Sequence, residues 1–154
     1  MASTGRTVPK HITFKIDDSG GTLRTIECVK SINGVGIEYD AADVTCMTEA
    51  LKNVLPGHGD CTITVVGNFS NTADTGFHTV FSKIVGVNTA LSMDIQIGVR
   101  SAWDEGEPQF GITSSGTSGM LCKEYTVNPE SMECTAVLRV SGATAPAWGT
   151  VAET

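Results

Sequence analysis

The chain lacks the features that mark membrane and secreted proteins. None of its apolar runs approaches the roughly 18 residues that a membrane-spanning helix requires. Its first ten residues, MASTGRTVPK, contain no apolar segment of the kind found in secretory signals. We therefore expect one domain, residues 1–154, that stays in the cytoplasm where it is made and has no contact with a membrane. Short arms, residues 1–9 and 143–154, are expected at its two ends.

Cysteine and histidine are scarce and poorly spaced for metal binding. The five cysteines are an odd number without a Cys-x-x-Cys pair, and the three histidines lie far apart. Most cysteines have apolar or β-branched neighbours, as in Asp60-Cys61-Thr62-Ile63, so we expect them to be small buried hydrophobic residues. A disulfide framework is the alternative. No metal or other cofactor is expected.

Positive charge is in deficit. Ten Lys and Arg residues stand against 17 Asp and Glu residues, which leaves a formal net charge of −7. Tight binding to nucleic acid depends on Lys and Arg side chains that release counterions from the phosphates. Specific DNA binding is therefore not expected, although such a protein can lie close to DNA without holding it.

Catalytic motifs are also missing. The sequence has no Gly-x-Ser-x-Gly elbow, phosphate loop or paired Cys and His nucleophile motif. Asp17-Asp18-Ser19-Gly20-Gly21 superficially resembles a calcium loop, but it lacks the alternating ligands and closing glutamate, so we interpret it as a hairpin turn. Asp104, Glu105 and Glu107 offer oxygens to a hard cation, although charges in such a turn are usually solvated. We expect a binding or structural protein rather than an enzyme.

One segment has the periodicity of an amphipathic helix. In residues 75–86 the apolar side chains recur at spacings of three and four, on one helical face. Asp74 and Thr75 offer N-cap oxygens, and Gly86 stands where a helix-ending residue with positive φ belongs. We predict a helix at about residues 75–85.

The rest of the chain predicts short strands. Seventeen glycines interrupt it, and apolar residues alternate with polar ones in several segments, most regularly in residues 91–100. A mainly β protein is expected: an antiparallel sandwich or barrel with one flanking helix. The strands are expected at about residues 12–16, 23–32, 36–45, 61–69, 91–100, 109–113, 121–128 and 133–141.

Residues 33–59 form an unusually long, polar and glycine-rich connection. We expect a long loop here that contains the strand at 36–45 and one short helical turn near residues 49–54. Long loops in compact domains are usually functional or disordered. The segment is therefore a candidate interaction site.

Several segments, taken in order, resemble the major tail tube protein family of long, non-contractile-tailed bacteriophages. Each motif is common by itself, and the resemblance rests on their shared order and spacing over about residues 10–143. The segments are Asp17-Asp18-Ser19-Gly20-Gly21-Thr22-Leu23-Arg24 followed by Ile26, Ser31-Ile32-Asn33-Gly34-Val35-Gly36-Ile37-Glu38-Tyr39 running to Asp43-Val44-Thr45, Leu55-Pro56-Gly57, Gly67-Asn68-Phe69-Ser70-Asn71-Thr72-Ala73 leading into Gly76-Phe77-His78, and Val140-Ser141-Gly142-Ala143.

This resemblance implies a β-sandwich or barrel that assembles into homohexameric rings. The rings would stack into a hollow tube that conducts DNA into the host without binding it specifically. Other copies of the chain, a tape-measure protein and tail-terminator or tail-tip proteins are the implied partners. The implied location is the virion tail, assembled in the host cytoplasm, and no catalytic residue or cofactor is implied.

Strand periodicity suggests which residues meet the lumen. If the apolar residues of 91–100 face the core, the polar residues between them share the opposite face, and two threonines of the 61–69 strand take the same position. We expect this face to line the lumen, with an ordinary solvated outer face as the alternative. The lumen-facing residues would be Thr62, Thr64, Ser92, Asp94 and Gln96.

The long loop is expected to be mobile in the free subunit and to become ordered on the neighbouring ring. Its contacts would come from Glu38, Asp40, Asp43, Glu49 and Lys52.

Two other functions remain open. A carbohydrate-binding or adhesin-type sandwich would present a cluster of exposed aromatic side chains, whereas aromatic residues make up only 6% of this chain. Trp103 and Trp148 fall near a turn and in the tail rather than along one strand. A tail-terminator or a tube subunit of a secretion system would share the fold, and the sequence does not separate these from a phage tube.

Overall fold

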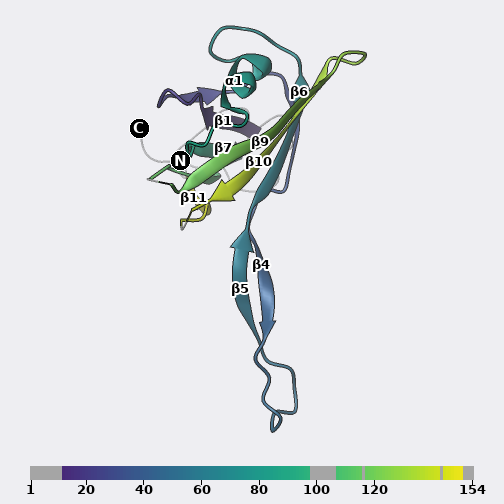
Figure 1. Ribbon diagram of the computed structural model, residues 1–154, viewed down its shortest axis with the longest axis vertical. Helices are drawn as coiled ribbons and strands as arrows, with labels where there is room; N and C mark the ends of the chain where they lie inside the picture. The colour runs from purple at the N-terminus through teal and green to yellow at the C-terminus, as the bar shows by residue number, and fades with distance from the viewer. Residues whose placement is uncertain (1–11, 98–106, 116, 143, 151–154) are drawn as a thin grey trace.

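The computed structural model describes residues 12–97, 107–115, 117–142 and 144–150. These residues form short strands and a single helix, α1 (Phe77–Ile84), in a body from which one hairpin projects (Figure 1). The strands are β1 (Ile12–Asp17), β2 (Leu23–Thr25), β3 (Val29–Asn33), β4 (Glu38–Asp43), β5 (Val54–Asp60), β6 (Thr62–Asn68), β7 (Met93–Ile97), β8 (Pro108–Ile112), β9 (Gly119–Asn128), β10 (Glu133–Ser141) and β11 (Ala147–Thr150).

Two antiparallel sheets make up the body. The five-stranded sheet has the order β11-β8-β7-β1-β2, and the four-stranded sheet has the order β3-β6-β10-β9. β4 and β5 pair only with each other and form the projecting ribbon (Figure 1). The predicted mainly β, antiparallel architecture is confirmed, and of the two predicted forms the described strands make open sheets rather than a closed barrel.

Alternating side chains of both sheets meet in one core. Along β6, Ile63 and Val65 are buried, whereas Thr62 and Thr64 face away from the core. β1 and β7 behave in the same way, with Phe14 and Ile95 side by side in the register and both buried. The buried hydrophobic residues are Phe14, Ile16, Ile26, Cys61, Ile63, Val65, Phe77, Val80, Phe81, Ile84, Leu91, Met93, Ile95, Phe110, Ile112, Met120, Cys122, Cys134, Ala136 and Leu138.

Helix α1 adds its apolar face to this core, as its periodicity predicts. Phe77, Val80, Phe81 and Ile84 are buried, and the Phe81 ring stacks on Phe14 with 6.2 Å between ring centroids. Gly86 has φ +74°, which confirms the predicted helix-ending conformation. Among the described residues, no helix is long and apolar enough to cross a membrane.

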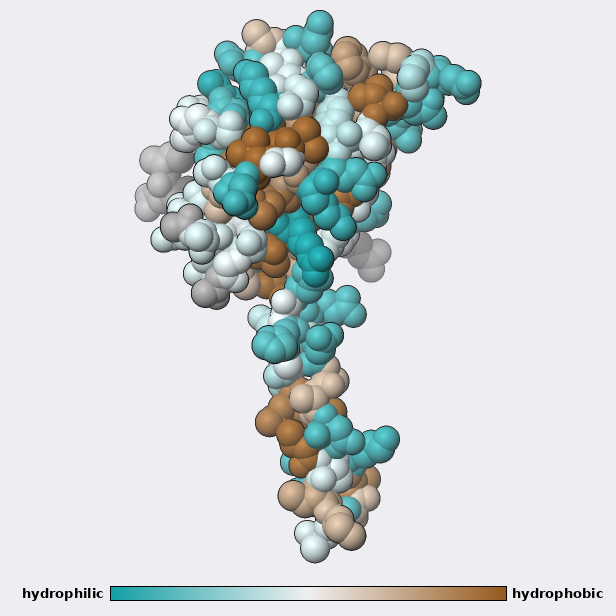
Figure 2. Space-filling view, in the orientation of Figure 1, coloured by the Kyte–Doolittle hydropathy of each residue, from teal (hydrophilic) through white to brown (hydrophobic). Residues whose placement is uncertain are grey.

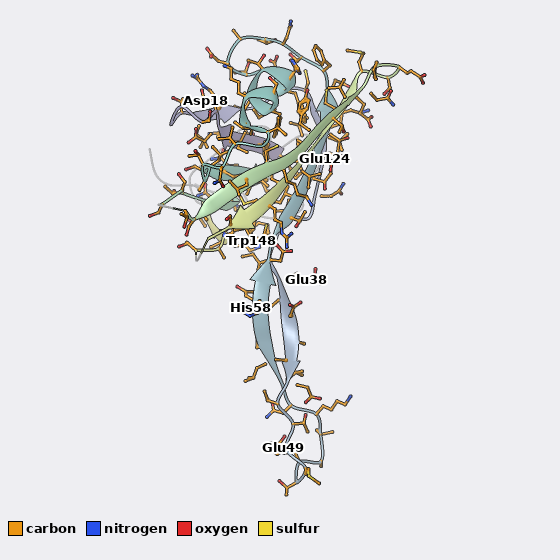
Figure 3. All side chains as sticks on the ribbon, in the orientation of Figure 1. Asp18, Glu38, Glu49, His58, Glu124 and Trp148 are labelled. Carbon is orange, nitrogen blue, oxygen red and sulfur yellow. The ribbon has the colours of Figure 1, made fainter. Side chains whose placement is uncertain are left out.

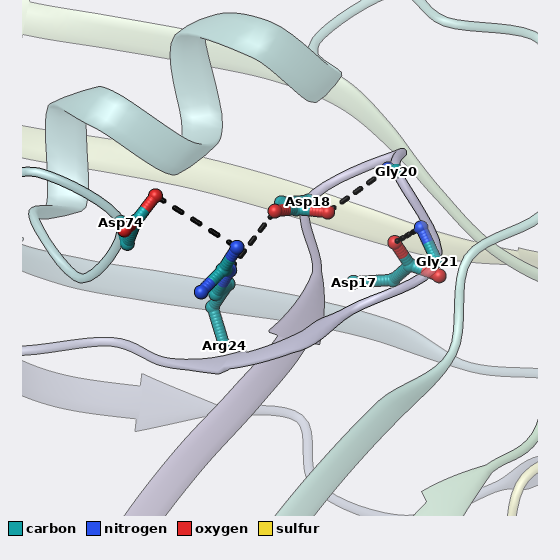
Figure 4. A network of polar contacts seen from close by, with 6 residues as sticks. All are labelled: Asp17, Asp18, Gly20, Gly21, Arg24 and Asp74. Carbon is teal, nitrogen blue, oxygen red and sulfur yellow. Dashed lines mark hydrogen bonds and ion pairs between the residues drawn. The ribbon is translucent and has the colours of Figure 1, made fainter.

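The helix begins differently from the prediction. Its N-cap residue is Gly76, and no side chain caps the first turn, so the expected capping by Asp74 or Thr75 is wrong. Asp74 instead lies 3.8 Å from the Arg24 guanidinium, in the network that Figure 4 shows. The carboxylate therefore ties the loop before α1 to the first hairpin rather than to the helix.

The first hairpin confirms the turn interpretation of residues 17–21. The Asp18 carboxylate accepts a hydrogen bond from Gly20 N at 2.9 Å and pairs with Arg24 Nε at 2.9 Å, while Asp17 accepts from Gly21 N at 3.1 Å (Figure 4). Arg24 holds the pKa of Asp18 below its ordinary value. Because these oxygens bind backbone N–H groups and a guanidinium, the loop has no calcium-site character.

The predicted strand at residues 23–32 is two strands in different sheets. β2 is an edge strand of the five-stranded sheet, whereas β3 is an edge strand of the four-stranded sheet. Between them Cys28 has φ +65°, a left-handed conformation that breaks an extended strand. Sequence alternation does not reveal this change of sheet, because both halves have strand-like composition.

The cysteines divide into two groups. All five are free thiols, and Cys61, Cys122 and Cys134 are buried, as expected. Burial raises the pKa of the Cys122 thiol to about 11. Cys28 and Cys46 are exposed, so the expectation of burial is wrong for these two.

Two segments are more regular than the sequence predicts. Residues 38–60 form the β4–β5 hairpin, and residues 49–54 make no helical turn, because Val54 already belongs to β5. Within the predicted C-terminal arm, β11 pairs with β8 at the edge of the five-stranded sheet, and Trp148 lies opposite Phe110. Tertiary pairing gives these polar and small-residue segments a structure that their own propensities do not predict.

Truncating the helix face tests this account of the core. Phe81→Ala removes a fully buried ring that contacts Phe14 and Phe77, so we expect the free energy of unfolding to fall by about 3–5 kcal/mol in urea denaturation. Lys83→Ala, an exposed position in the same helix, should change it by less than about 0.5 kcal/mol. Equal losses for the two variants would contradict the packing described here.

Candidate interaction surfaces

The β4–β5 hairpin stands out by its exposure among the described strands and helix. Every residue of both strands is exposed. Figure 2 shows that the hairpin carries apolar as well as polar surface well away from the body. A two-stranded ribbon with no sheet or helix packed on it is only marginally stable in water. The exposed hairpin is therefore suited to contact a partner.

Apolar side chains are concentrated toward the hairpin tip, residues 44–53. Met47 and Leu51 have relative exposures of 105% and 83%, whereas Trp148, the most exposed large hydrophobic residue described in the body, has 55%. Val54 and Leu55 of β5 extend the apolar surface toward the body. Apolar groups gathered on an exposed projection mark a protein-binding site more often than a solvated one.

The residues expected to contact a neighbouring ring all lie on this hairpin, and two of them have a structural role. Asp43 accepts a hydrogen bond from Thr45 N at 2.9 Å, and the Thr45 side chain lowers the pKa of this carboxyl. Glu49 accepts a hydrogen bond from Cys46 N at 3.1 Å. Glu38, Asp40 and Lys52 are exposed and make no ion pair with described residues, and Figure 3 shows Glu38 and Glu49 at opposite ends of the hairpin.

A concave surface surrounds the neck of the hairpin, where β5 passes into β6. One cavity there has a volume of about 330 Å³, with apolar lining from Ile37, Tyr39, Cys61, Val140 and Ala145. Asp60 and Arg139 form an ion pair beside it at 3.3 Å. The cavity is formed by residues that are remote in sequence.

The expected lumen residues fall on two faces that point in opposite directions. Thr62 and Thr64 lie on the outer face of the four-stranded sheet, whereas Ser92, Asp94 and Gln96 belong to the five-stranded sheet. Because the inner faces of both sheets share one core, their outer faces cannot line the same wall. The structure therefore does not bring the five residues together, and each group stays a separate prediction.

Asp94 is less solvated than its position on an outer strand face predicts. Its Oδ1 atom is buried without a hydrogen-bond partner, and Oδ2 accepts a hydrogen bond from Gln96 Nε2 at 3.2 Å. Burial raises the pKa of this carboxyl, with partial compensation from Lys15 on the neighbouring strand. Gln96 is itself only 8% exposed, so this part of the face is not a simple solvated surface.

Unpaired strand edges are the third candidate surface. The four-stranded sheet ends in the ten-residue β9 on one side and in β3 on the other, whereas the five-stranded sheet ends in β2 and β11, of three and four residues. Long edges offer rows of free N–H and C=O groups to another chain. The first part of β9 is already bonded within the subunit, because Met120 exchanges backbone hydrogen bonds with Leu91 and Cys122 O accepts one from Gly86 N. The later part of β9 and the whole of β3 are therefore the edges that the four-stranded sheet can offer to another chain.

Sequence reasoning missed the apolar tip, the neck cavity and β11. Met47, Leu51, Val54 and Leu55 were visible as apolar residues in an otherwise polar segment, and that contrast was an available signal. The neck cavity left no comparable signal, because its walls come from three separate parts of the chain.

Comparison with solved structures identifies the fold. A chain in the cryo-EM structure of the anti-feeding prophage cap, described as a tube terminating cap, aligns with 98% of this chain and 95% of its own length, at TM-score 0.64 and 11% identity. A chain in the sheath–tube complex of the PVC extracellular contractile injection system aligns over 95% and 93%, at TM-score 0.61 and 11% identity. A chain in the tail of an empty gene transfer agent particle aligns over 96% and 100%, at TM-score 0.58 and 20% identity.

The chain has the fold of subunits from phage-tail-like particles. At these identities the likeness establishes the fold alone. No protein-family profile matches the sequence, and no curated protein matches it. The shared fold covers nearly the whole chain, including the region of the projecting hairpin.

Neutralising Asp94 tests whether burial of its unpaired carboxylate oxygen destabilises the folded state. The pKa of Asp94 is raised above its ordinary value of 3.8 in the folded state. At pH values between the unfolded-state pKa and this raised pKa, the folded state therefore binds more protons than the unfolded state. Wild-type stability therefore falls as pH rises through this window. We expect Asp94→Asn to be more stable than wild type at neutral pH in urea denaturation, with a difference that shrinks as pH falls through the raised pKa. Glu130→Gln, in an exposed turn, controls for the loss of one charge.

Proposed function

We propose that the chain is a structural subunit of a phage-type tail tube, in which homohexameric rings stack around a lumen that conducts DNA. The observation that carries the proposal is the fold shared over nearly the full chain with chains of tail-like particles, one of which was refined with C6 symmetry. The exposed edges and projecting hairpin supply surfaces for two kinds of self-contact. These are lateral contacts within a ring and axial contacts between rings.

Lateral contacts would join the four-stranded sheets edge to edge. Strand direction alternates across this sheet, so β3 and β9 run in opposite directions. Rotation about an axis roughly parallel to the strands preserves these directions, so β9 of one copy would meet β3 of the next as an antiparallel pair. Such head-to-tail contacts close into a ring when the rotation permits. Ring closure would satisfy both edges in every copy.

The resulting barrel would be wide enough for DNA. Six copies would contribute four strands each. At about 4.8 Å between strands and a tilt of roughly 40°, a ring of 6 × 4 = 24 strands has a backbone diameter of about 48 Å. Barrels of about 16–18 strands already leave an aqueous channel. The lumen would then be lined by the outer face of the four-stranded sheet, with Thr62 and Thr64, and the Asp94 face would lie on the outside of the tube.

The surface chemistry suits a conduit. The outer face of β6 presents threonine hydroxyls, and Arg139, which lies opposite Thr62 on the same face, is already paired with Asp60. Each copy carries a net charge of −7. Phosphates would therefore meet few of the cationic contacts that cause retention. In the tail, tape-measure and tail-tip or terminator proteins would be the further partners.

A tube-terminating subunit is the second candidate, because one of the similar chains comes from a structure described as a tube terminating cap. A terminator would form single rings that stop further growth, whereas a tube subunit would stack repeatedly. The length of the assemblies separates the two functions.

Assembly of the purified protein tests the proposal. We expect rings of six copies by light scattering coupled to size exclusion, and stacked tubes in electron micrographs at high concentration or with a tape-measure partner. Single rings that never stack under either condition would favour a terminator. A monomeric mass across a wide concentration range, with no polymers in micrographs, would contradict both functions.

Charge insertion on the two outer faces tests which one lines the lumen. Thr64→Lys and Asp94→Lys both add a lysine to the outer side of a strand, one in each sheet. We expect particles with Thr64→Lys to eject DNA more slowly at low salt, with recovery at high salt, because added lysines attract phosphates. Asp94→Lys particles that still form tubes should eject at the wild-type rate. The reverse pattern would place the five-stranded sheet at the lumen.

A further inference from the structure

The hairpin tip and the neck cavity point to a specific contact between successive copies. We infer that the apolar tip of one copy, centred on Met47 and Leu51, enters the neck cavity of a copy in the next ring. This inference rests on the proposed tube function and names the receiving surface on the partner. The partner is a second copy of this chain.

The inserting element is apolar and held in shape by its own hydrogen bonds. Val44 N donates to Asn53 O at 2.9 Å, and Asn53 N donates to Thr45 Oγ1 at 2.7 Å, so the two ends of the tip are joined. Glu49 closes the turn through Cys46 N. Met47 and Leu51 point into solvent from this framework. A preorganised turn loses little conformational freedom on binding.

The receiving cavity has room for these side chains, and part of its lining is apolar, whereas His58, Asp60 and Thr144 line the rest. Its volume of about 330 Å³ accommodates the ends of two aliphatic side chains, and its walls include Ile37, Val140 and Ala145. Cys61 lines it as a buried thiol at the junction of β5 and β6. Gly59 and Gly142 also line the cavity, so backbone rather than side chain borders it at two positions. Insertion of an apolar side chain here would remove the apolar surface of both the side chain and the cavity from water.

Charge around the neck complements the single lysine of the hairpin. Lys52 is exposed at the tip and has no ion-pair partner among described residues. Asp40, on the adjacent face of the neck, is exposed and likewise unpaired, and a neighbouring cavity of about 450 Å³ lies between it and Arg139. A tip seated in the neck of another copy would bring Lys52 toward an acidic surface.

The geometry favours a contact between copies over one within a copy. β5 has seven residues and therefore spans about 24 Å, which separates the tip from its own neck. Tip and neck are different surfaces, so each copy can give one contact and receive another. Such a heterologous contact along an axis does not close and produces an open stack. The hairpin length would then set much of the spacing between rings.

Directed cross-linking tests the contact in assembled protein. Cys46, next to Met47, is an exposed native thiol, and Thr144 and Ala145 line the receiving cavity. Cys28→Ser removes the other exposed thiol, and Thr144→Cys or Ala145→Cys then supplies an acceptor in that background. Glu130→Cys, in the exposed β9–β10 turn, is the matched control. A disulfide needs Cα atoms about 4.4–6.8 Å apart, so two acceptor positions sample the geometry.

We expect oxidised tubes with either acceptor to give a ladder of dimers, trimers and longer chains on a non-reducing gel, because each copy gives and receives one link. The control should remain monomeric. Dimers without longer products would indicate a symmetric contact and overturn the inference. Intact tubes with no ladder at either acceptor would overturn it while leaving the tube function standing. Wild-type protein that forms no rings or tubes would overturn both.

A second measurement does not depend on disulfide geometry. Met47→Asp places a charge on the inserted side chain, and Met132→Asp makes the same change at another exposed methionine, in the β9–β10 turn. We expect the first to raise the critical concentration for tube growth by at least about tenfold and the second by less than about twofold, since few residues carry most of an interface's energy. Rings should still form in both. Equal effects of the two substitutions would contradict insertion of the tip.

Discussion

The packing of α1 and the inner faces of both sheets on one another is the interaction on which the rest of the structure depends. Phe77 and Phe81 lie 4.6 Å apart between ring centroids, and Phe81 stacks on Phe14 of β1. These rings join the only described helix to both layers of strands. Because a sandwich buries one face of each sheet, this core leaves the outer faces of the described sheets, their edge strands and one hairpin for contacts with other molecules, although the first part of β9 is already bonded within the subunit.

Those remaining surfaces are the ones on which the proposed function, contact between chains, depends. The described residues contain no group of His, Cys, Asp or Glu side chains able to hold a metal ion. Six of the eleven large hydrophobic residues described as exposed lie on the hairpin, away from the core. Edge, neck and hairpin tip are therefore better understood as parts of an assembly than as features of an isolated domain.

The periodicity of the sequence correctly predicted those elements whose structure is determined by residues close to them in sequence. The helix face from Phe77 to Ile84, the alternation of Ile63 and Val65, and the Gly20–Gly21 turn follow from spacing and residue type alone. The rest depends on partners distant in sequence. At Cys28 the chain passes from one sheet to the other. Thr64 and Asp94 occupy equivalent polar positions in alternating strands, yet their side chains lie on oppositely directed outer faces, because the sheet to which a strand belongs is not a local property. The hairpin tip carried a signal in Met47 and Leu51, whereas the neck cavity exists only after Ile37 and Tyr39, the end of β5, and the end of β10 with the residues that follow it come together.

A helical reconstruction of the assembled protein by cryo-electron microscopy tests the central claim most directly, because it locates strand neighbours across the subunit boundary. The account predicts β9 of each copy beside β3 of the next, with the four-stranded sheets forming one closed wall around the lumen. It also predicts that the β4–β5 hairpins lie between successive rings. A wall built from the five-stranded sheets, or rings whose β3 and β9 edges remain unpaired, would contradict it.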